Sequence, residues 1–73
     1  MIKDKKRARE ISSLMLDIGK RINDSIANVQ QGCTEEEFKA YRSACGKILG
    51  YMLVDILNPL YESHPDLKPK DLH

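Results

Sequence analysis

Apolar residues recur at spacings of three and four through the first half of the chain, which is the pattern of an amphipathic helix. The series runs through Ile11, Leu14, Met15, Ile18, Ile22, Ile26 and Val29. No proline interrupts this segment, so the pattern predicts one helix over about residues 3–31. Gly32 follows directly and is predicted to end the helix in the left-handed conformation that glycine adopts without strain.

A capping box predicts the start of a second helix. Thr34 is followed three residues later by Glu37, so each side chain can bond to the backbone amide of the other. Helical spacing then continues over about residues 34–58, with the apolar positions Phe38, Tyr41, Cys45, Ile48, Leu49, Met52, Leu53, Ile56 and Leu57. Pro59 lacks an amide hydrogen and predicts a kink or a short extra turn.

The link between the two predicted helices is too short for any arrangement other than antiparallel neighbours. The expected fold class is therefore all-α, a two-helix antiparallel hairpin over residues 1–63. Residues 64–73 contain two prolines and alternating charges, which predicts an irregular tail. Leu67 and Leu72 are the tail residues able to pack back on the hairpin. We interpret the tail as a segment that caps the end of the hairpin. The alternative is that the tail docks on a partner protein.

The second helix carries more apolar surface than one antiparallel neighbour can cover. Because soluble monomers rarely expose such a strip, we expect a homodimer of hairpins that forms a four-helix bundle. The expected association surface consists of Gly46, Leu49, Met52, Leu53, Leu57 and Leu60. Gly46 either allows close approach there or is simply tolerated on an exposed face, and on the first interpretation Gly46→Leu is expected to weaken association. The alternatives are a monomer with its tail over the strip, a higher oligomer and an unidentified protein partner.

Composition argues against a general electrostatic attraction to nucleic acid or membrane. Charged residues are 32% of the 73-residue chain and apolar residues 41%, but the formal net charge is only +1. No apolar run approaches the roughly 18 residues of a membrane span. The basic start of the sequence lacks the apolar block of a secretory signal, so the expected location is the cytoplasm.

One basic cluster supports a second functional hypothesis, a small nucleic-acid-binding regulator. Its candidate contact residues are Lys5, Lys6, Arg7 and Arg9. No aromatic platform for bases accompanies them, and antiparallel folding would place this end beside the acidic residues of the tail. We therefore rank nucleic-acid binding as the runner-up.

Residues that could carry chemistry are few and scattered. Cys33 and Cys45 are interpreted as a loop thiol and a small core residue rather than a disulfide or a zinc site. His64 and His73 have no serine or cysteine at a spacing that would make a nucleophile and base. We expect no enzymatic activity, no cofactor and no metal. The leading hypothesis is a non-enzymatic, self-associating helical module for protein–protein interaction.

Overall fold

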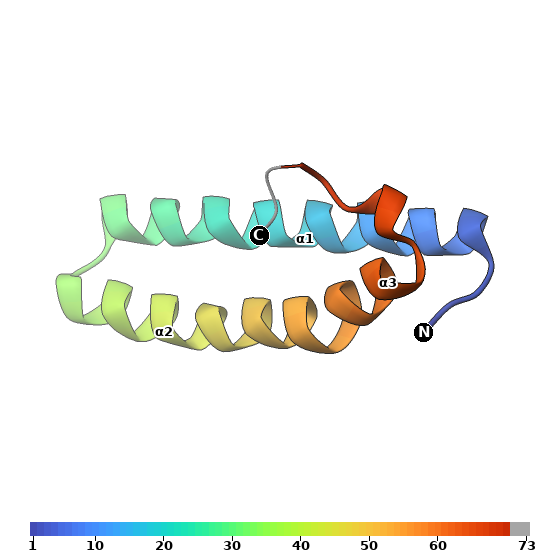
Figure 1. Cartoon of the computed structure of the whole chain (residues 1–73). Helices are drawn as coiled ribbons and strands as arrows, with labels where there is room; N and C mark the ends of the chain where they lie inside the picture. The colour runs from blue at the N-terminus through green and yellow to red at the C-terminus, as the bar shows by residue number, and fades with distance from the viewer. Residues whose placement is uncertain (71–73) are drawn as a thin grey trace.

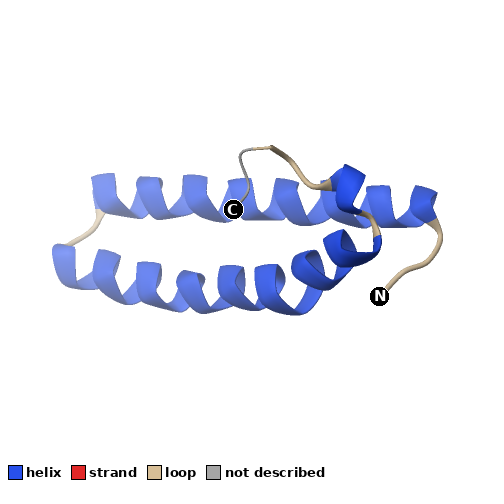
Figure 2. Cartoon of the chain, in the orientation of Figure 1, coloured by secondary structure: helices blue, strands red, loops and turns tan. Residues whose placement is uncertain are grey.

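Two long antiparallel helices form the molecule, as Figure 1 shows. The computed structural model describes residues 1–70, in which helix α1 (Lys5–Gly32) packs along helix α2 (Glu35–Tyr51). Helices and connecting loops make up all of this part of the chain (Figure 2). It measures 44 × 19 × 16 Å, about the length of α1 itself. The predicted all-α hairpin is confirmed.

Helix α1 begins and ends differently from the sequence prediction. Asp4 is its N-cap, and the Asp4 carboxylate accepts a hydrogen bond from the amide of Lys6 at 3.0 Å. At the other end, α1 includes Gly32, and no residue among those described has a positive φ. The predicted left-handed Gly32 is therefore wrong. Two extended residues, Cys33 and Thr34, reverse the chain instead.

The predicted capping box starts α2. The Thr34 hydroxyl accepts from the amide of Glu37 at 3.2 Å, and Glu37 accepts from the amide of Thr34 at 2.9 Å. This exchange satisfies two backbone donors that the first turn of a helix leaves free. The bond from the Thr34 amide is the main cause that lowers the pKa of the Glu37 carboxyl, and the Thr34 side chain lowers it further.

After α2 the chain stays helical but changes its winding. A π-helix, η1 (Met52–Leu57), leads into the short helix α3 (Asn58–Ser63), which bends toward α1 (Figure 1). The amide of Asn58 bonds to the carbonyl of Leu53, five residues earlier. We attribute the wider spacing to Pro59, because proline cannot donate to the carbonyl four residues before it.

The main cluster of buried apolar side chains lies at the end of the hairpin where residues 1–8 meet residues 57–67. Ala8 of α1 packs there against a cluster from η1 and α3 that consists of Leu57, Leu60 and Tyr61. Ile2 and Leu67 pack against this cluster from the two terminal segments, whereas Leu72 lies outside the described residues. Leu67 of the tail therefore packs on this end of the hairpin.

Polar contacts join the two terminal segments at the same end of the molecule. Lys5 pairs with Asp66, which follows Pro65 in the 3-10 helix η2 (Pro65–Leu67). The His64 ring bonds to the carbonyl of Ile2 at 2.6 Å, and the N-terminal amine donates to Ser63 at 3.4 Å. The first and last described segments are thus joined by an ion pair and two hydrogen bonds, which we call the terminal clasp.

Candidate interaction surface

The structure divides the predicted association residues between core and surface. Leu60 is fully buried, Met52 and Leu57 are buried, and Leu49 and Leu53 are half-buried. Gly46 is exposed, and a Cβ built there meets nothing within 4 Å. Packing within one chain therefore buries three of the six predicted association residues. Position 46 has room for a larger side chain.

The last leucines of the predicted stripe are buried by contacts at the end of the hairpin. Leu57 and Leu60 pack with Ala8 and Tyr61 in the core, and Leu53 packs against this cluster. Leu57 also lines one groove with Leu49 and Leu53, so these three leucines stay on one side of the helix through η1. The sequence pattern placed Leu57 and Leu60 on the surface because it could not show which distant residues would cover them.

A different set of large apolar side chains remains exposed. Leu14 of α1 is 48% exposed, whereas Ile48 and Tyr51 of α2 are 53% and 69% exposed. Ile18 and Ile48 lie on a shared groove of about 340 Å³, which is lined by Met15, Ile18, Ile48, Tyr51, Met52, Asp55 and Ile56. We call this side of the hairpin, with Leu14, Ile18, Ile48 and Tyr51 at its centre, the open face.

The tail packs on the opposite side. Residues two apart in an α-helix point in nearly opposite directions, so Leu16 points away from Leu14 and Ile18. Ser12 shares the stripe of Leu16 and bonds to Tyr61 of α3. The tail side holds a second groove of about 430 Å³, in which Lys20 is the charged residue. Contacts with α3 and the tail therefore lie on the tail side and leave the open face uncovered in one chain.

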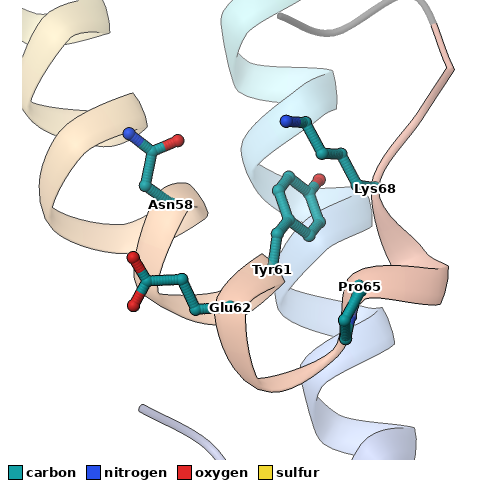
Figure 3. Close-up of a pocket in the computed structure, with 5 residues that line it drawn as sticks. All are labelled: Asn58, Tyr61, Glu62, Pro65 and Lys68. Atoms are coloured by element: carbon teal, nitrogen blue, oxygen red, sulfur yellow. The ribbon is translucent and has the colours of Figure 1, made fainter.

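Polar residues at the base of the tail line a further open hollow of about 380 Å³ (Figure 3). Its lining consists of Asn58, Tyr61, Glu62, Pro65 and Lys68. The Tyr61 hydroxyl is already bonded to the Ser12 hydroxyl at 2.6 Å, and both residues are buried. No buried polar side-chain atom within the described chain lacks a hydrogen-bond partner. This hollow therefore offers no unsatisfied group that points to a ligand.

The basic cluster is partly neutralised within the chain. Lys5 pairs with Asp66, and Arg7 pairs with Asp4. These contacts lower the pKa of both carboxyl groups, chiefly through the hydrogen bonds from Lys5 and Arg7. Lys6 and Arg9 are exposed and form no ion pair within residues 1–70. The structure thus leaves half of the predicted nucleic-acid contacts free.

The remaining candidate groups are two cysteines and two histidines. Cys33 is free and exposed and Cys45 is free and buried, as expected of a loop thiol and a small core residue. His64 belongs to the terminal clasp, and His73 lies outside the described residues. Within residues 1–70, no group of three or more His, Cys, Asp or Glu side chains could hold a metal ion. None of the described helices has the length and apolar character needed to cross a membrane.

Sequence reasoning missed two polar residues that the structure shows to matter. Asp4 has no role in the sequence prediction, although aspartate just before a helix is a common N-cap signal. Ser12 has no role in it either, yet it is only 5% exposed. Its partner Tyr61 is 49 positions away, so no local signal could have revealed the contact.

Comparisons with known proteins found no relative of this chain. No family model, curated protein or solved structure matches the chain.

Proposed function

We propose that the chain is a non-enzymatic helical interaction module whose open face binds a second copy of itself. One observation carries the proposal: Leu14, Ile48 and Tyr51 expose large apolar side chains beside a groove that has apolar walls. Burying such surface is favourable at about 25 cal/mol per Å². Two hairpins joined in this way would form a four-helix bundle.

The dimensions of the hairpin suit this partner. Its broad side is 44 by 19 Å, of the order of the 800 Å² or so that each partner buries in a standard protein interface. A chain of this size also buries a smaller fraction of its surface than larger domains do, so a partner adds substantially to its core. The tail occupies the other side of the molecule, which favours the open face over the leucine stripe expected from sequence.

Light scattering or sedimentation equilibrium at tens of micromolar tests the proposal. We expect a species of twice the 8.3 kDa mass of one chain. Ile48→Glu should convert it to a folded monomer, because burying an unpaired carboxylate at the interface costs several kcal/mol. Leu16→Glu is the matched control, since Leu16 is exposed on the tail side, and it should leave the mass unchanged.

The result that contradicts the proposal is equally specific. A wild-type chain that stays monomeric at these concentrations and still melts cooperatively would eliminate self-association. A dimer that survives Ile48→Glu but is lost in Leu16→Glu would move the interface to the tail side. Far-ultraviolet circular dichroism of each variant separates loss of association from loss of folding.

A further inference from the structure

Two charged residues at the edge of the open face are spaced symmetrically about Tyr51 along the sequence. Lys47 precedes Tyr51 by four residues and Asp55 follows it by four. All three line one shallow hollow on the outer side of α2 and η1. Ile48 and Val54 lie three residues before and after Tyr51, and both are more than half exposed. The sequence on one side of Tyr51 therefore complements the sequence on the other.

This arrangement matters because a two-fold dimer pairs each surface patch with its own copy. In an antiparallel pair of identical helices, residues equidistant from the axis face one another. An axis at Tyr51 thus places Lys47 level with Asp55 of the partner chain. Opposite charges then meet at the rim of the contact.

Helix α1 has a compatible register. A Cβ built at Gly19 would lie 3.8 Å from the Leu49 side chain, so these two residues are level across the hairpin. Because the helices are antiparallel, Tyr51 is level with the stretch of α1 just before Gly19. Leu14 lies three residues before that level and Ile18 lies one residue after it, so one axis across both helices passes between these two apolar residues of α1.

The two charged residues have no other ion-pair partner within the described chain. The ion pairs among residues 1–70 join Lys5 to Asp66, Arg7 to Asp4, Arg21 to Asp17 and Lys39 to Glu35. Lys47 and Asp55 are both exposed and enter none of them. They are therefore available to a partner without loss of an existing contact.

We infer that a second copy binds the open face in one register, with the two-fold axis crossing α2 at Tyr51 and Lys47 paired with Asp55 of the partner chain. This inference rests on the proposed self-association and specifies its geometry. It places α1 on α1 and α2 on α2, each pair antiparallel. Two symmetry-related ion pairs then flank a central contact between the two Tyr51 side chains.

A charge-swap experiment by sedimentation equilibrium at low salt tests this register. Lys47→Asp and Asp55→Lys each create two like-charge contacts in a homodimer, and each should weaken the dimer about tenfold. An equimolar mixture of the two variants should restore dimerisation, because both contacts in the mixed dimer join opposite charges. The double variant should also recover the wild-type constant. Lys20→Asp, on the tail side, is the matched control and should have no effect.

Each other outcome overturns the inference. If both single variants dimerise like the wild type while Ile48→Glu does not, the open face associates in another register, and the proposed function stands without this geometry. If the single variants weaken the dimer and the mixture does not recover, net charge rather than this pairing is responsible. If the wild type is monomeric, the proposed function and the inference fail together. Circular dichroism confirms that each variant is folded.

Discussion

The hydrogen bond between Ser12 and Tyr61 is the buried polar contact that joins α1 to α3. Each residue is only 5% exposed, and their hydroxyl oxygens lie 2.6 Å apart. A hydroxyl buried in apolar surroundings is costly unless it is bonded, so the two groups need each other. The bond therefore fixes how α3 is rotated against α1 more specifically than apolar packing alone.

Tyr61→Phe tests that contribution. We expect the free energy of unfolding to fall by about 1–3 kcal/mol, because the variant leaves the buried Ser12 hydroxyl without its partner. Adding Ser12→Ala should recover part of this loss by removing the unsatisfied group. Urea denaturation at fixed protein concentration measures both effects. An unchanged midpoint for Tyr61→Phe would show that the bond does not contribute to stability.

Thr34→Ala tests the capping box at the start of α2. The variant removes the acceptor for the Glu37 amide, and we expect a loss of about 1 kcal/mol in unfolding free energy. Thr34→Ser keeps a hydroxyl in place and is the control, with nearly wild-type stability. Thermal melts followed by circular dichroism give the comparison, and equal melting temperatures for the two variants would contradict the prediction.

At the scale of elements, a π-helix links α2 to the short helix that completes the core. Pro59 removes the donor for one carbonyl, and the wider winding of η1 accommodates that loss. Leu57 at the end of η1 and Leu60 of α3 then pack in the core at the end of the hairpin. The proline thus sets the backbone of the segment that carries both leucines.

Leu60→Ala measures the strength of this core. Leu60 is fully buried, so the variant should lose about 2–5 kcal/mol of unfolding free energy through lost burial and the cavity that remains. A chain this small has little stability to spare, and its thermal transition should broaden or disappear. Leu16→Ala, at an exposed apolar position outside the open face, is the control. If Leu60→Ala melted at the wild-type temperature, the main stabilising contacts would have to lie elsewhere in the molecule.

The sequence predicted those elements whose signals are local. Thr34 and Glu37 are three residues apart, and the apolar spacing of α1 repeats along one helix, so both could be identified from neighbours in the chain. The conformation of Gly32 and the burial of Leu57 depend on contacts with the rest of the fold. The open face was missed for the same reason, because its exposure follows from which other residues the core and tail occupy.

At the scale of the whole molecule, the hairpin has two dissimilar sides and one closed end. The tail side is partly covered by α3 and η2, and the open face is bare in a single chain. The terminal clasp closes the end with the Lys5–Asp66 pair and the His64 bond to Ile2. In the proposed dimer, this covering would direct association to the open face.

The clasp should weaken in acid. The hydrogen bond from Lys5 holds the pKa of Asp66 below its usual value of 3.8, so this contribution is present above that value and is lost as pH falls through the folded-state pKa. We expect the melting temperature to fall as pH decreases from about 5 to about 3.

Asp66→Asn isolates the clasp from the other carboxylates. The variant should have a lower melting temperature than the wild type near neutral pH and a smaller further decrease in acid. Asp17→Asn, which removes a pair within one helix, controls for exposed ion pairs in general. Parallel melting curves for the wild type and Asp66→Asn across this pH range would contradict the assignment.

Closing the core requires an encounter between segments that are far apart along the chain. The contacts of α1 with α2 near the turn join near neighbours in sequence, whereas the bond from His64 to Ile2 spans 62 positions. Loops of that length are slow to close, so helix formation and turn formation should precede the final collapse. Loop insertions between α1 and α2 should therefore slow folding more than they change the unfolding rate.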